Sequence, residues 1–320
     1  MAVLAEWMRR ATEQLAKHSG PAIGGLLLVS FGSVAELMLA FFVLASGETE
    51  VVQAQVTGSI IATSLFGLGL AIFVGGLKRK KQVFNPAHAG LLSTLLILAV
   101  VALSLPAVFD YTGRLRAHVQ DMRITDESFS LGAAVVLILL YGGNLVYTMF
   151  THQSTFADGE SKGHASWSIG VAAALMVVTT GLIALEAEAI SRTLTETGEA
   201  AGLPPTFLGV IVLALVGTSA DLFAACWFSY EGKISLALEI CIGSSIQIAL
   251  VVAPLLVLVS AVIWQPMTLV FHNPMYLFAI ASTAFVVNAV ARDGETNWFE
   301  GMLLIGVYVL FALGFFYVAP

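Results

Sequence analysis

Two acidic residues, Glu36 and Asp221, lie within long apolar segments of this 320-residue chain. Each follows a glycine and a hydroxyl residue, in the stretches Gly32-Ser33-Val34-Ala35-Glu36 and Gly217-Thr218-Ser219-Ala220-Asp221. Asp221 comes 185 positions after Glu36, and the same interval separates two later pairs, Gly58-Ser59 and Gly243-Ser244. A carboxylate at membrane depth is energetically costly and usually functional. The pattern therefore predicts two related half-sites that bind a cation or protons.

The residues around the acids offer only oxygen ligands. Glycine lets a membrane helix kink or break, which frees backbone carbonyls that a cation can then bind. Carboxylates, hydroxyls, amides and carbonyls suit a hard cation such as Ca²⁺ or Na⁺, whereas the Cys and His ligands typical of zinc or copper are lacking. The predicted cation- and proton-binding residues are Glu36, Asp221, Ser33, Thr218, Ser59, Ser244 and Gln247, and the predicted helix breaks are at Gly32, Gly217, Gly58 and Gly243. Glu188 could act as a proton relay or an entrance ligand.

The composition places these motifs in a polytopic, all-α membrane protein. Hydrophobic residues make up 58% of the chain and charged residues only 11%, against roughly 25% charged in soluble domains. Apolar runs long enough to span a bilayer recur from end to end. The predicted spans are 22–45, 51–76, 86–109, 130–150, 166–191, 204–229, 234–263, 274–291 and 298–318.

The connecting segments predict the orientation. With the amino terminus in the cytoplasm, inside segments carry ten Lys and Arg residues and outside segments carry four. This is the positive-inside pattern, and the basic cluster 78–81 is its strongest part. We interpret that cluster as a solvated anchor and expect no nucleic-acid partner, because no basic face continues from it.

The orientation also predicts an inverted repeat. The span that carries Asp221 comes five spans after the span that carries Glu36. Because five is an odd number, the two spans run through the membrane in opposite directions. Inverted repeats place two equivalent half-sites near the midplane. The predicted organisation is an amphipathic segment at 1–21, a first repeat at 22–150, a cytoplasmic linker at 151–165 and a second repeat at 166–320. The repeats have four and five helices, so the counterpart of the helix at 166–191 is expected to be missing.

The charges of the two acids favour exchange. Two ionised carboxylates at mid-membrane cost on the order of 3 kcal/mol each. One Ca²⁺ or two protons would neutralise the pair, so the loaded states should cross between the two sides more readily than the empty one. Obligatory exchange follows from that difference.

These motifs resemble those of the Ca²⁺:cation antiporters, specifically the CAX-type Ca²⁺/H⁺ exchangers. The likeness covers nearly the whole chain and is carried by Gly32, Ala35, Glu36, Gly58, Ser59, Ile60, Gly217, Ala220, Gly243, Ser244, Ser245 and Gln247. The resemblance implies an inverted-repeat cation exchanger fold, with Glu36 and the acid at Asp221 as cation and proton ligands. It also implies that Glu188 corresponds to a glutamate on the family's sixth core helix.

Several positions depart from the family pattern. The family's Asn is replaced by Ser33, Thr218 and Thr63 in this chain. Its second Glu is replaced by Asp221, and its usual His by Leu222. The oxygen chemistry is preserved while the ligands become shorter, so the identity of the cation stays open.

We therefore expect a secondary active transporter that exchanges Ca²⁺ or another cation for protons by alternating access. The alternatives are an Na⁺/H⁺ or Na⁺/Ca²⁺ exchanger of the same fold, a truncated non-transporting paralogue or subunit, and a channel. No motif for a membrane enzyme is found. We expect no cofactor, and the expected partners are inorganic cations, protons and the lipid bilayer, with homo-oligomerisation left open. The expected location is a prokaryotic inner (plasma) membrane.

Overall fold

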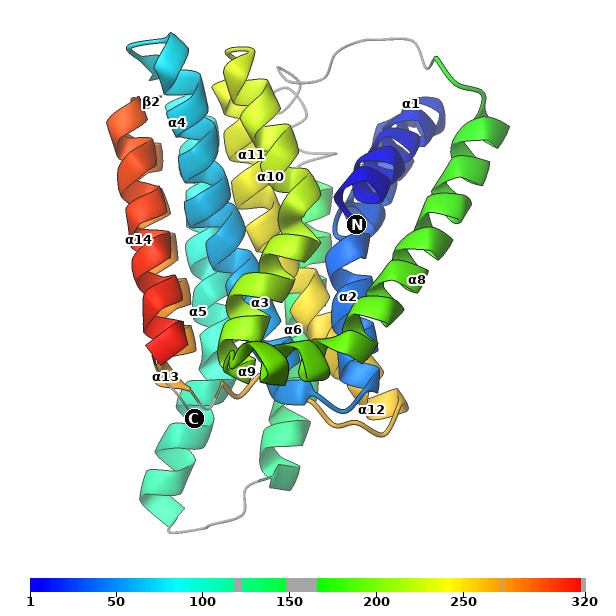
Figure 1. Cartoon of the computed structure of the whole chain (residues 1–320), viewed down its shortest axis with the longest axis vertical. Coiled ribbons are helices and arrows are strands. Elements are labelled where there is room, and N and C mark those ends of the chain that lie inside the picture. Colours follow the sequence, from blue (N-terminus) through cyan, green and yellow to red (C-terminus); the bar gives the residue numbers. More distant parts are fainter. Residues whose placement is uncertain (118–122, 148–165, 272, 318–320) are drawn as a thin grey trace.

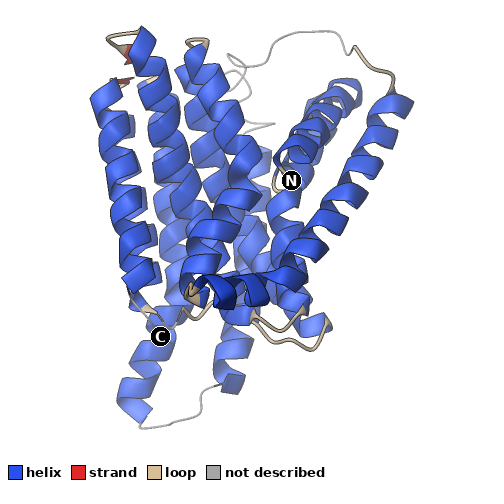
Figure 2. Ribbon diagram, in the orientation of Figure 1, coloured by secondary structure: helices blue, strands red, loops and turns tan. Residues whose placement is uncertain are grey.

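The computed structural model describes residues 1–117, 123–147, 166–271 and 273–317, and almost all of them are helical (Figure 2). Most of the long helices run roughly alongside one another, as Figure 1 shows. The elements are α1 (Ala2–Gly32), α2 (Val34–Ala45), α3 (Thr49–Ile61), η1 (Ala62–Gly67), α4 (Leu68–Lys78), β1 (Gln82–Val83), α5 (Pro86–Ala117), α6 (Arg123–Val146), α8 (Ile169–Ala201), α9 (Pro205–Phe207), η4 (Leu208–Leu213), α10 (Ala214–Tyr230), α11 (Ile234–Gln247), η5 (Ile248–Val252), α12 (Ala253–Val262), α13 (Pro274–Arg292), β2 (Glu295–Thr296) and α14 (Trp298–Tyr317).

The helices confirm the predicted membrane architecture. Among the described residues, eight helices are long and apolar enough to cross a bilayer, and they coincide with eight of the nine predicted spans. The ninth, predicted at 22–45, is divided between the end of α1 and the shorter apolar helix α2. A helix satisfies its own backbone hydrogen bonds, which is what a lipid environment requires. The predicted linker at 151–165 lies outside the described residues.

Corresponding turns in the two halves have the same geometry. Gly47 and Gly232, which are 185 positions apart, both have φ of +88°, a backbone conformation that favours glycine. Each donates its N–H to the carbonyl oxygen three residues earlier, at 2.9 Å. Because both turns precede a buried helix of the motif, the two halves build the same helical hairpin.

The core is formed by the hairpins that carry the motifs. Helix α10 packs against α4 and α11, and η4 packs against α3. The helices α6, α8 and α14 are the least buried of the spans and surround this core. Strands β1 and β2 form a short antiparallel pair at one end of the bundle.

The amino-terminal segment is helical and packs along α8 (Figure 1). The hydroxyl of Thr180 donates to the sulfur of Met8 at 3.5 Å. Met1 contacts Glu186, the residue 185 positions further on. With this interval, residues 2–16 correspond to residues 187–201 of α8. The amino-terminal helix therefore occupies part of the position of the counterpart of α8, which was predicted to be missing.

Candidate functional site

The acids of the two repeats come together between α2 and α10. Glu36 lies in the first turn of α2 with only 3% of its surface exposed. The backbone of α10 approaches it so closely that a Cβ on Gly217 would lie 3.2 Å from the Glu36 Cγ. The carboxylates of Glu36 and Asp221 interact electrostatically. The structure therefore joins the two predicted half-sites.

The first motif also contacts the second half through Gln247 on α11. The Ser33 hydroxyl donates to Gln247 Oε1 at 2.9 Å. A Cβ on Gly32 would lie 3.1 Å from the same oxygen, so glycine permits this approach. Ser33 and Gln247, two of the predicted ligands, thus lie together beside Gly32.

The predicted helix breaks need correction at three of the four glycines. The chain is interrupted at Gly32, where α1 ends and Ser33 has non-helical angles before α2 begins. Helices α10, α3 and α11 run unbroken through Gly217, Gly58 and Gly243, respectively. Gly217 serves close helix packing instead, and Gly58 does so more strongly, because a Cβ there would overlap the carbonyl of Val210.

Irregular helical segments lie one turn beyond both Gly-Ser pairs. Helix α3 continues into the π-helical segment η1, and α11 continues into η5. The two segments occupy corresponding positions in the repeats, because residues 62–67 correspond to 247–252. Such π segments are rare and often occur at functional sites.

Hydroxyl groups meet where α3 and α11 cross. Ser245 Oγ lies 2.7 Å from Thr63 Oγ1 and 2.5 Å from Ser64 Oγ. It also donates to the carbonyl of Ile60 at 3.3 Å. Ile60 is the residue of the first repeat that corresponds to Ser245. The pseudo-twofold axis therefore passes through this crossing, next to the two Gly-Ser pairs.

Several buried oxygens of α3 have no hydrogen-bond partner. They are Ser59 Oγ, Thr57 Oγ1 and Gln55 Oε1. The Ser244 side chain interacts with Asp221, and Gln55 Nε2 donates to the Glu36 carbonyl oxygen at 3.4 Å. By contrast, the Thr218 hydroxyl is already used, because it donates to the Ala214 carbonyl at 2.8 Å. Buried polar atoms normally have partners, so these free oxygens are suited to a cation.

No cluster of three or more His, Cys, Asp or Glu residues capable of holding a metal ion forms in the described parts of the chain. Besides the two acids, the described residues of the site offer neutral oxygens as ligands. This set fits a hard cation as transported substrate.

Glu188 lies apart from the other predicted residues. It is on the partly exposed side of α8, and its carboxylate accepts a hydrogen bond from Arg192 at 2.6 Å. A role at the entrance stays a prediction.

Two residues of the site were not predicted. Gln55 lies one helical turn before Ser59, and its polarity inside an apolar span was a signal that could have indicated it. Tyr141 on α6 is 6% exposed and hydrogen-bonds Gln247. Leu222, at the position where the resemblance led us to expect His, packs against Gly67.

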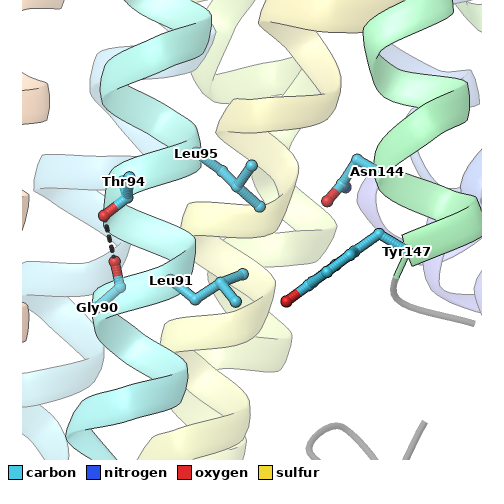
Figure 3. Close-up of a pocket in the computed structure, with 6 residues that line it drawn as sticks. All are labelled: Gly90, Leu91, Thr94, Leu95, Asn144 and Tyr147. Atoms are coloured by element: carbon cyan, nitrogen blue, oxygen red, sulfur yellow. Dashed lines mark hydrogen bonds between the residues drawn. The ribbon is translucent and has the colours of Figure 1, made fainter. Parts of the chain in front are cut away.

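A separate cavity of about 410 Å³ lies between α5 and α6 (Figure 3). Leu91 and Leu95 project toward Asn144 and Tyr147 across it, and the Thr94 hydroxyl bonds back to the Gly90 carbonyl at 2.8 Å. Its lining includes none of the predicted site residues. The candidate site is the cluster around the acids, which lies apart from this cavity.

Comparison with known proteins is consistent with this geometry. The family model for the sodium/calcium exchanger protein matches residues 1–150 and 171–317. The chain belongs to this exchanger family. The match to the exchanger family includes the amino-terminal helix and both motifs, and it confirms the resemblance found in the sequence.

Relatives within the exchanger family carry more specific names. The chain is 38% identical over 319 residues to the Ca²⁺/H⁺ antiporter ChaA of Bacillus subtilis, covering 98% of this chain and 88% of that one. It is 36% identical over 330 residues to a Ca²⁺/H⁺ antiporter of Aphanothece halophytica, covering 98% and 87%.

The fold is that of solved exchangers. The structure of native YfkE matches with a TM-score of 0.82 at 35% identity, covering 98% of this chain and 88% of that one. The H⁺/Ca²⁺ exchanger CAX matches with a TM-score of 0.70 at 17% identity, covering 98% and 82%, which supports the fold alone. The predicted cation exchanger fold is confirmed, and this family is one of transporters.

Proposed function

We propose that this protein exchanges Ca²⁺ for protons across a prokaryotic plasma membrane, with its amino terminus in the cytoplasm. The observation that carries the proposal is the pairing of Glu36 and Asp221, one from each repeat, among buried oxygens without partners. The names of the relatives in Bacillus subtilis and Aphanothece halophytica support Ca²⁺ and H⁺ as substrates.

In this mechanism the two acids bind either one Ca²⁺ or protons. The calcium ion would be held by both carboxylates together with the Ser59 and Ser244 hydroxyls and Gln55. Release of the ion leaves two like charges in a site with little water, and protons arriving at the carboxylates remove that cost. The loaded forms then move between the two sides, whereas the empty charged form does not.

A sodium-coupled exchanger of the same fold is the second candidate. It is supported by the description of the family and by the short hydroxyl side chains Ser33 and Thr218, which also suit Na⁺. Both candidates use the same acids, so an experiment has to distinguish them by the ion.

The test is transport by purified protein in liposomes with an imposed pH gradient, to which Ca²⁺, Na⁺ and K⁺ are added in turn. We expect added Ca²⁺ to dissipate the pH gradient, and we expect both Glu36→Gln and Asp221→Asn to abolish this response. Glu231→Gln is the control, because Glu231 is a partly exposed residue paired with Lys233 at the end of α10. A response to Na⁺ alone would favour the second candidate. No response to any ion from correctly inserted protein would refute exchange by this chain.

A further inference from the structure

Buried residues of the amino-terminal helix pack against the segments that carry the two acids. Ala5, Met8 and Thr12 are buried on this helix, and Arg9 lies on the same face because it is four residues beyond Ala5. Ala5 and Met8 form one apolar cluster with Ala35 and Ala220, the residues directly before the two acids, and with neighbouring side chains. This packing brings Arg9 towards Asp221.

Arg9 is held in place by acidic residues of its own helix. Its Nε donates to Glu6 Oε2 at 2.9 Å and its Nη2 to Glu6 Oε1 at 3.0 Å, a two-pronged ion pair. Arg9 also pairs with Glu13, and Arg10 donates to Glu6 at 2.7 Å. The side chains of Arg9 and Glu6 are only 25% and 19% exposed. Charge-assisted bonds of this kind favour the ionised forms of both partners.

Asp221 interacts electrostatically with both members of this pair. Arg9 stabilises a negative charge on Asp221 and repels a cation bound there, whereas Glu6 does the opposite. Since both side chains are mostly withdrawn from solvent, salt screens them less than surface charges.

We propose that Arg9 and Glu6 set the electrostatic potential at the Asp221 half of the cation site and thereby determine its preference between divalent and monovalent cations. This inference rests on the proposed exchange function. Arg9 and Glu6 act through the field at Asp221 and do not bind the cation themselves.

The fold-change in apparent KM for a divalent ion should be the square of the fold-change for a monovalent ion. The reason is that the electrostatic interaction energy is proportional to the charge of the ion. If Arg9→Gln lowers the apparent KM for Na⁺ about threefold, it should lower that for Ca²⁺ about tenfold. Glu6→Gln should raise both constants, again more strongly for Ca²⁺.

The opposite signs separate this role from a structural one. Arg9→Gln and Glu6→Gln break the same ion pair, so a merely structural role would shift the cation affinity in one direction for both variants. Arg9→Lys is the rescue control, because it keeps the charge while losing the two-pronged geometry.

The experiment measures the apparent KM for Ca²⁺ and Na⁺ in liposomes, and the rise in Tm of the detergent-solubilised protein as each ion is added. The second readout needs no transport, since any ligand of the folded state raises its stability. We expect tighter Ca²⁺ binding for Arg9→Gln, weaker binding for Glu6→Gln and binding close to wild type for Arg9→Lys.

Each remaining outcome decides the matter. Shifts in the same direction for both glutamine variants, unchanged affinities, or an Arg9→Lys variant that behaves like Arg9→Gln would overturn the inference while the exchange proposal stands. A wild-type protein that binds Ca²⁺ without exchanging it would refute the exchange proposal, and the opposite binding shifts would still support the role of Arg9 and Glu6. Absence of any cation-dependent stabilisation would overturn the inference.

Discussion

Two glycines at corresponding positions of the repeats should respond in opposite ways to the same substitution. Gly58 and Gly243 occupy corresponding positions in the two repeats, and each is followed by serine. A Cβ on Gly58 would overlap the Val210 carbonyl, whereas a Cβ on Gly243 would meet no atom within 4 Å. We predict that Gly58→Ala destabilises the protein and that Gly243→Ala does not.

The magnitudes follow from the contacts. The Gly58 contact is between two helix backbones, so relief requires one helix to move, and such overpacking costs about 3 kcal/mol. Alanine gains about 1 kcal/mol over glycine within a helix. Gly58→Ala should therefore lose about 2 kcal/mol of stability. Gly243→Ala meets no atom and should gain about 1 kcal/mol.

The assay is equilibrium unfolding of both variants in mixed micelles at increasing denaturing detergent, followed by tryptophan fluorescence. Each glycine serves as the matched control for the other. Equal stabilities of the two variants, or a larger loss for Gly243→Ala, would refute the packing argument.

Transport gives a second readout of the same pair. Under alternating access the repeats exchange roles, so in the opposite state Gly243 would approach residue 25 as Gly58 now approaches Val210. We expect Gly243→Ala to fold normally and yet exchange ions more than tenfold more slowly, because about 2 kcal/mol would oppose one of its two states. A fully active Gly243→Ala protein would contradict this exchange of roles.

Two further predictions concern single contacts. Tyr141→Phe removes the hydroxyl that hydrogen-bonds Gln247 and should weaken the apparent cation affinity about three- to tenfold, with little change in maximal rate. The measurement is the KM for Ca²⁺ in liposomes. An unchanged KM would show that Tyr141 only fills space. Asn273 caps α13 by accepting from the Met275 N–H at 2.9 Å, so Asn273→Ala should cost about 1 kcal/mol in equilibrium unfolding without altering transport, and a transport defect at normal stability would contradict this role.

Much of the architecture could be predicted without coordinates. Apolar length and the absence of charge are local properties, and they located the spans to within a few residues. The 185-residue interval is also a property of the sequence, and it identified the repeat and the paired acids Glu36 and Asp221. These features are inferred reliably because lipid constrains each helix separately.

Other features depend on contacts between residues far apart in the chain. Gly58 and Gly243 are both followed by serine, yet of the two only Gly58 is closely packed, because one conformation of an inverted repeat is not symmetric. Tyr141 reaches Gln247 only because α6 lies beside α12 and η5.

The sequence by itself determined which residues could bind a cation and that they come in two opposed copies, since residue type and spacing are written along the chain. Only the tertiary structure decided which oxygens remain free, which glycine is closely packed, and that Arg9 interacts electrostatically with Asp221. The physical reason is that these properties arise from the packing of whole helices, which bring together residues that no local pattern connects.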